Sequence, residues 1–168
     1  ALAEQFFHYL DDCRGRCDTV VGDARIELEA LAATTAPPEW DLLLVDAFAG
    51  DAIPVHLVTL EAVELDRQLV ADDGYLLFHV SNRYYGLIPV LARIARELGV
   101  PAAYKRRLYG TAVGEDPSEY FVFLPSEAAF DALAPLGWTR VDPSTAASAD
   151  LWTDDHVDTL GALVLDWE

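Results

Sequence analysis

Two aspartates, Asp46 and Asp51, stand in the stretch VDAFAGDAIPVHL (residues 45–57), directly after the apolar run 42–45. A carboxylate beside a buried strand is costly unless a partner pairs with it or a reaction uses it. Two carboxylates close together can anchor a cationic group, and one within reach of a substrate can accept a proton. The stretch is therefore the first candidate for a site, although Asp51 next to Gly50 also suits an Asx turn.

Other polar residues follow other apolar runs. Gly22-Asp23-Ala24 come directly after Val20-Val21, and His79 lies near the end of GYLLFHV (residues 74–80). In open α/β sheets, ligands bind at the carboxyl ends of the strands, which gives these residues and Asp46 one common edge. Each also has a plainer interpretation: Asp23 suits a helix N-cap, His79 a hydrogen-bonded group behind the site, and Tyr84 the core rather than a pocket wall.

Apolar spacing indicates the elements that must position these residues. Continuous apolar runs are typical of strands covered on both faces, as in a parallel sheet. Residues 60–70 and 84–98 have helical spacing, with Thr59 as a cap before the first and Gly99 after the second. This alternation predicts a doubly wound α/β fold whose last two strands, joined by a short link, pair antiparallel. The expected strands are 18–22, 41–48, 74–81, 101–109 and 119–125, and the expected helices are 1–10, 24–33, 60–70, 84–98, 126–137 and 158–167.

The composition predicts one folded domain over residues 1–168. Hydrophobic residues make up 52% and aromatic residues 11%, enough for a core. The net charge of −18 repels phosphate backbones and anionic lipid surfaces. We therefore expect no nucleic-acid partner, and a small cationic molecule is the ligand that such a surface attracts.

Cysteine and histidine usage points away from metal and hydrolase chemistry. Cys13 and Cys17 have no second Cys/His pair at ligand spacing, so we expect no metal site and two free thiols in a reducing, cytoplasmic compartment. No Ser–His–Asp or Cys–His arrangement stands out in the sequence, which disfavours a hydrolase. No apolar run reaches the roughly 18 residues of a membrane span, and no signal peptide is visible.

The order VVGDAR, DLLLVDAFAGDAIPVHL, GYLLFHVSNRYYGLIPVL and LWTDD resembles the spermidine/spermine synthase-like family over about residues 7–155. That family has the class I S-adenosylmethionine-dependent methyltransferase fold. The resemblance implies a Rossmann-like three-layer sandwich with a mostly parallel sheet and an antiparallel C-terminal hairpin. The family's glycine-rich loop has no counterpart, since no GxG occurs in the 168 residues. We therefore expect about five strands, without the first two of that fold, in a piece of a longer chain whose bacterial relatives are often fused to membrane segments.

The resemblance also implies an activity. It is the transfer of an aminopropyl group from decarboxylated S-adenosylmethionine, or a reaction of S-adenosylmethionine itself, with a polyamine as the acceptor and no metal. Asp46 would be the base and ammonium anchor, Asp51 its helper, and His79 and Tyr84 further substrate contacts. Gly22, Asp23 and Ala24 would hold the nucleoside, with Asp23 at the adenine amine. In the family the second acid follows three positions after the first, whereas here the interval is five.

Two alternatives stay open at this point. A methyltransferase on the same fold would bind S-adenosylmethionine in preference to the decarboxylated form. A truncated, non-catalytic domain would instead assemble with itself or with a partner, because missing strands leave apolar sheet edges exposed. Exposed edges also predict a homo-oligomer.

Overall fold

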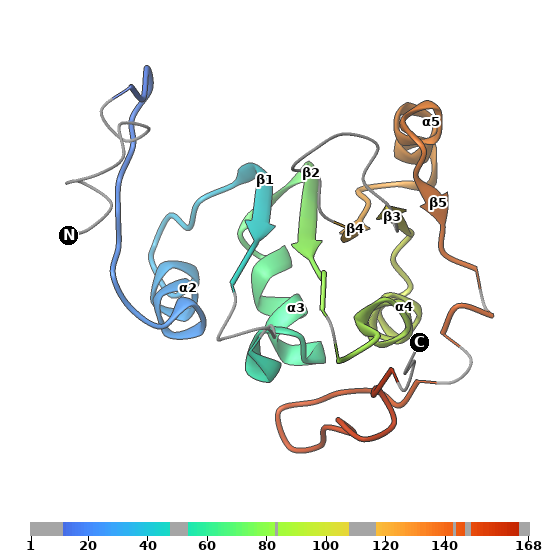
Figure 1. Cartoon of the computed structure of the whole chain (residues 1–168). Helices are drawn as coiled ribbons and strands as arrows, with labels where there is room; N and C mark the ends of the chain where they lie inside the picture. Colours follow the sequence, from blue (N-terminus) through green and yellow to red (C-terminus); the bar gives the residue numbers. More distant parts are fainter. Residues whose placement is uncertain are drawn as a thin grey trace.

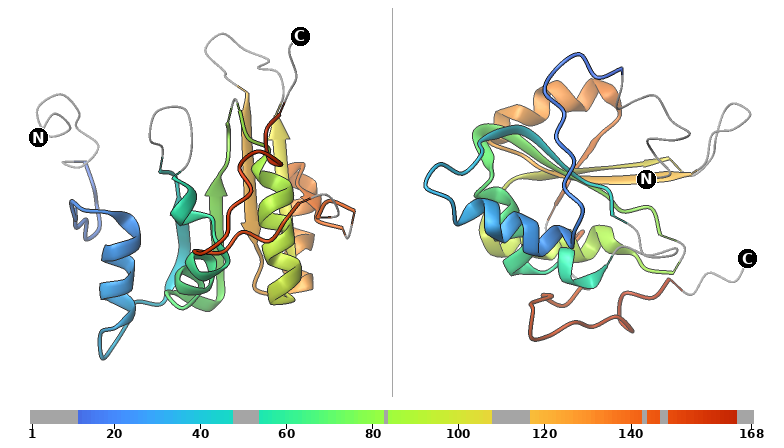
Figure 2. Two further views of the ribbon diagram at one scale, coloured as in Figure 1. Left: turned by 90° about the horizontal axis from the view of Figure 1, so that it is seen from below. Right: turned by 90° about the vertical axis from the view of Figure 1, so that its left-hand side faces the viewer.

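The computed structural model describes residues 12–47, 54–82, 84–107, 117–142, 144–146 and 149–164. Within these residues the fold is α/β, with helices on both faces of a five-stranded mixed sheet (Figures 1 and 2). In chain order the elements are α2 (Ala24–Ala32), β1 (Trp40–Val45), α3 (Leu60–Arg67), β2 (Val70–His79), α4 (Leu87–Leu98), β3 (Ala102–Arg107), β4 (Ser118–Phe123), α5 (Phe130–Leu133) and β5 (Thr139–Arg140). Short 3₁₀ turns span Val55–Leu57, Glu127–Ala129 and Ala134–Leu136.

The sheet is mixed rather than mostly parallel, which corrects the expectation from the sequence. Its order is β1-β2-β4-β3-β5, and among the described strands only β1 and β2 run parallel. The β2–β4, β4–β3 and β3–β5 pairs are antiparallel. The predicted antiparallel pairing of residues 101–109 with 119–125 is confirmed as β3–β4, and β4 inserts between β2 and β3. The fifth strand is β5, which the sequence did not indicate, and not residues 18–22.

Residues 18–22 form no strand. Val20 is 67% exposed and Val21 is 94% exposed, and the segment leads directly into α2. A strand needs a neighbour for its backbone N–H and C=O groups. In the described part of the chain no strand pairs with the outer edge of β1, and residues 18–22 form no ladder with any described strand. The same missing neighbour leaves Leu42 and Leu44 of β1 exposed.

The main core lies between the sheet and helices α3 and α4. Phe78 of β2 and Phe121 of β4 are fully buried there against the apolar face of α4. Trp152, from the C-terminal segment that runs past the outer side of these helices, closes this core (Figure 2). The other sheet face carries a smaller cluster against α5, around Val122. The layer of α3 and α4, the sheet, and the layer of α5 are the three layers that the resemblance implies.

Two glycines fix local geometry that other residues could not adopt cheaply. Gly99 ends α4 in the left-handed region, with φ of +64°, so the predicted helix end is confirmed. Gly74 lies in a bulge where β2 pairs with β1, between Trp40↔Val70 and Leu42↔Tyr75. A Cβ at Gly74 would come within 2.6 Å of the Trp40 carbonyl oxygen. The helix expected over 60–70 is shorter than predicted, because α3 ends at Arg67 and the chain enters β2 at Val70.

Other expectations fail for local reasons. The helix expected over 126–137 is three short turns, with Pro135 at the start of the last one. Residues 158–164 of the expected C-terminal helix form turns, and the expected helix at 1–10 lies outside the described residues. Cys13 and Cys17 are joined in a disulfide, not free, because the CRGRC segment brings their Cα atoms to 6.5 Å. No described helix is long and apolar enough to cross a membrane.

Candidate functional site

A cleft of about 620 Å³ separates α2 from the open edge of β1. Its walls are mostly apolar, with Leu28 and Leu31 from α2 facing Leu43 and Leu44 from β1. Three residues that the sequence singled out, Gly22, Ala24 and Asp46, also line it; Asp46 comes directly after the carboxyl end of β1. A mostly apolar cleft with a few placed polar groups is the usual form of a small-molecule site.

Asp46 is held by His79 at the end of β2, and His79 is in turn held by Ser81, just beyond that strand. Oδ1 of Asp46 lies 2.8 Å from Nδ1 of His79, and Nε2 of His79 lies 2.7 Å from Oγ of Ser81. The parallel register, with Val45 opposite Phe78, brings Asp46 and His79 together at the carboxyl ends of β1 and β2. The sequence did not indicate a Ser–His–Asp arrangement, so that expectation is corrected: the three side chains form a continuous hydrogen-bonded line.

The position of the line decides what chemistry is available. Asp46 lines the cleft, and its side chain is about half exposed. Ser81 does not line that cleft, and its Oγ accepts a hydrogen bond from the backbone N–H of Glu119 at 2.8 Å. A nucleophilic serine must present its oxygen to the substrate. Here the carboxylate is the end of the line that meets the cleft, which suits binding of a cation or acceptance of a proton.

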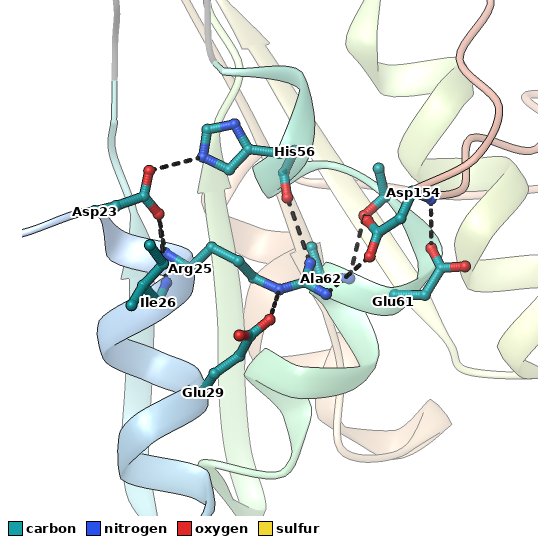
Figure 3. Close-up of polar contacts among 9 residues, drawn as sticks. Asp23, Arg25, Ile26, Glu29, His56, Glu61, Ala62 and Asp154 are labelled. Carbon is teal, nitrogen blue, oxygen red and sulfur yellow. Dashed lines mark hydrogen bonds and ion pairs between the residues drawn. The ribbon is translucent and has the colours of Figure 1, made fainter.

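Asp23 is the N-cap of α2, as one of the two interpretations of the sequence predicts. Its Oδ1 accepts hydrogen bonds from the backbone N–H groups of Arg25 at 2.9 Å and Ile26 at 3.3 Å. Its Oδ2 lies 3.4 Å from Nε2 of His56 (Figure 3). A carboxylate has about four acceptor positions, so the cap leaves Asp23 room for one further donor. Neighbouring Gly22 packs so closely against the Glu27 side chain that a Cβ at residue 22 would collide with it.

Arg25 and Asp154 tie α2 to the start of α3 (Figure 3). Nη2 of Arg25 donates to Asp154 Oδ2 at 3.1 Å, and the Thr59 hydroxyl donates to Asp154 Oδ1 at 2.6 Å. The backbone N–H of Asp154 donates to Glu61 at 2.9 Å, while Thr59 also caps α3 through the N–H of Ala62. The LWTDD segment, whose role the sequence did not reveal, is therefore a clamp that holds the helix carrying Asp23 against α3.

Asp66 is a cleft residue that sequence reasoning missed. It lies near the end of α3 and is only 4% exposed. Burial raises the pKa of Asp66 to about 7, and the charge of Arg25 offsets only part of that rise. A signal was present in the sequence, because Asp66 is four residues after Ala62 and three before Leu69, on the face that α3 buries.

The remaining predicted site residues are not gathered at the cleft. Tyr84 is 48% exposed and is not among the residues that line it, so it is neither the expected core aromatic nor part of this wall. Asp51 lies outside the described residues. Asn82 orders the loop after β2 by accepting hydrogen bonds from the backbone N–H groups of Tyr84 and Tyr85. The described residues contain no group of three or more acidic, histidine or cysteine side chains placed to hold a metal ion.

Part of the chain is similar in sequence to a known protein. It is 34% identical over 86 residues to a polyamine aminopropyltransferase of Vibrio vulnificus. The chain is a distant homologue of that enzyme. The match covers 49% of this chain and 27% of the relative, so the chain spans about a quarter of the enzyme's length. No family model matches the chain.

One solved structure is also similar. The crystal structure of MNMC2 from Aquifex aeolicus superposes with a TM-score of 0.42 at 16% sequence identity. The superposition covers 85% of this chain and 41% of that protein.

Proposed function

We propose that the protein is a spermidine synthase-like aminopropyltransferase. It transfers an aminopropyl group from decarboxylated S-adenosylmethionine to a polyamine. The observation that carries the proposal is Asp46, a carboxylate fixed by His79 at the end of a strand and lining an apolar cleft. The homology to a polyamine aminopropyltransferase and the net charge of −18, which attracts cationic amines, support the same substrate class.

In this reaction the acceptor enters as an ammonium ion and must lose a proton before it can attack. Asp46 binds the ammonium and receives that proton. The amine lone pair then forms a bond to the aminopropyl carbon next to the sulfonium. The carbon–sulfur bond breaks, its electrons go to sulfur, and neutral methylthioadenosine leaves. In the proposal, substrates that fill the cleft between its apolar walls displace water from around Asp46, which strengthens the attraction between carboxylate and ammonium.

The nucleoside side of the site is assigned to the other wall. Gly22 and Ala24 line the cleft at the start of α2, and Asp23 stands between them as the cap. In the proposal, Asp23 Oδ2 accepts a hydrogen bond from the adenine amine and exchanges its contact with His56 for it. Asp51 is the proposed second carboxylate for the amine.

The test replaces Asp46 by its neutral isostere. In the full-length protein with putrescine and decarboxylated S-adenosylmethionine, Asp46→Asn lowers kcat by a factor on the order of 10² to 10⁴, the usual contribution of a general base. Asp41→Asn is the matched control, because Asp41 is an exposed carboxylate on the same strand. Its activity stays at the wild-type level. An Asp46→Asn variant with full aminopropyl transfer would show that the assigned role is wrong.

A further inference from the structure

A line of hydrogen bonds runs from the cleft into the sheet. Asp46 Oδ1 contacts Nδ1 of His79 at 2.8 Å, and Nε2 of His79 contacts Ser81 Oγ at 2.7 Å. Ser81 Oγ is in turn fixed by the backbone N–H of Glu119, on β4, at 2.8 Å. The His79 ring also stacks on Tyr120, with ring centroids 4.7 Å apart and planes 18° apart. Three strands thus cooperate to hold one imidazole.

The donors and acceptors along the line fix the tautomer of the neutral imidazole. A carboxylate only accepts, so Nδ1 of His79 carries a proton and donates it to Asp46. Ser81 Oγ accepts from the amide of Glu119, and its own hydroxyl proton is then available to Nε2. The neutral ring with its proton on Nδ1 satisfies each of these contacts. The opposite tautomer would place a lone pair against the carboxylate.

We propose that His79 is a positioning residue that orients Asp46 toward the acceptor amine, and that Ser81 holds His79 in the required tautomer. The inference rests on the proposed function and adds a division of roles to it. Nδ1 of His79 already carries a proton, which it donates to Asp46 Oδ1. A proton taken from the amine by Asp46 therefore cannot pass on from Oδ1 to that nitrogen. Asp46 is therefore the proton acceptor of the line, through Oδ2, since Oδ1 is the oxygen that faces His79. In this proposal His79 acts on the amine through Asp46.

Side-chain isosteres separate a positioning role from bulk packing. Asparagine places an amide N–H near the position of Nδ1, whereas glutamine places it near Nε2. His79→Asn therefore keeps the contact to Asp46, and its kcat stays within roughly tenfold of wild type. His79→Gln loses that contact, and kcat falls by a factor on the order of 10², the usual cost of a misplaced catalytic group. Its KM for decarboxylated S-adenosylmethionine stays unchanged, because the nucleoside wall is not altered. His156→Gln, on an exposed turn, is the control with wild-type kinetics.

A second measurement does not depend on activity. Nitrogen-15 NMR of the imidazoles, with the His79 signals assigned by their loss in His79→Asn, gives a neutral ring protonated on Nδ1 and unprotonated on Nε2. Ser81→Ala removes the donor to Nε2 and shifts His79 toward the other tautomer. A wild-type His79 with its proton on Nε2 would overturn the inference, as would His79→Gln with the kcat of His79→Asn.

The two measurements also separate this inference from the proposed function. If the wild-type protein transfers no aminopropyl group while the predicted tautomer is present and depends on Ser81, the proposed function fails and the assigned hydrogen-bond line stands. If the wild-type protein transfers the group and His79→Gln is equally active, the proposed function stands and the positioning role fails. Three results together support the positioning role of His79: a loss of kcat in His79→Gln, retained activity in His79→Asn, and a wild-type imidazole with its proton on Nδ1.

Discussion

The buried carboxyl of Asp66 makes the stability of the fold depend on pH. Its pKa rises from an ordinary value of 3.8 to about 7, mainly because burial disfavours the charged form. The folded protein therefore binds this proton more tightly than the unfolded chain does. The contribution of Asp66 to stability is fully present below about pH 4 and is lost as the pH rises to about 7. Above that, its contribution is constant.

The size of the effect follows from the shift. A displacement of about three pH units, at roughly 1.4 kcal/mol per unit, corresponds to about 4 kcal/mol. Asp66→Asn replaces the ionisable group by a neutral one of nearly the same shape. At pH 8 we expect the variant to be more stable than wild type by up to about 4 kcal/mol, and at pH 5 by only about 1.5 kcal/mol.

Urea unfolding at both pH values measures this difference. With an m-value of about 2 kcal/mol per M, Asp66→Asn moves the midpoint at pH 8 up by as much as roughly 2 M. Asp73→Asn is the control, because Asp73 is an exposed carboxylate on β2, and its gain over wild type is small and the same at pH 5 and pH 8. An Asp66→Asn variant whose advantage is absent at pH 8, or no larger there than at pH 5, would refute the reasoning.

Three further predictions concern the clamp, the cap of α4 and the edge of β1. Asp154→Asn weakens the contact to Arg25 and lowers the free energy of unfolding, measured in urea titrations, by about 1 to 2 kcal/mol. The control Asp155→Asn, at the exposed neighbouring position, changes it by less than about 0.5 kcal/mol, and equal effects of the two variants would contradict the clamp. Gly99→Ala forces an alanine to φ of +64° and costs about 1 kcal/mol, measured in the same way, and an unchanged midpoint would argue against this cap. Leu44→Lys places a charge on the exposed edge of β1 and shifts the protein toward monomer in sedimentation, and a wild-type protein that is already monomeric would rule out the proposed self-association.

Elements whose signal lies in a short stretch of sequence were predictable. The apolar run at residues 42–45 indicates β1 without reference to the rest of the chain. The helical spacing and the final glycine likewise indicate α4, and the structure has both elements in the expected regions. Residues 18–22 have the same kind of apolar pattern but no neighbouring strand in the described residues, and Val21 is exposed. Whether an apolar run becomes a strand depends on the rest of the sheet, which local pattern does not reveal.

The candidate site shows the same limit. Strand ends indicated that Asp46 and His79 share one edge, but their contact depends on the register that sets Val45 opposite Phe78. The clamp joins Arg25 to Asp154 across 129 positions of the sequence, a distance over which spacing carries no signal. Asp66 could have been found from the buried face of its helix, yet its raised pKa depends on how deeply that face is covered.

The most direct test of the central claim is to identify the product. Full-length protein is incubated with putrescine and either decarboxylated S-adenosylmethionine or S-adenosylmethionine, and the amine and nucleoside products are measured by mass spectrometry. Our account predicts spermidine and methylthioadenosine in equal amounts from the decarboxylated form, with Asp46→Asn strongly impaired. A methylated amine formed from S-adenosylmethionine, with no transfer from the decarboxylated form, would contradict it.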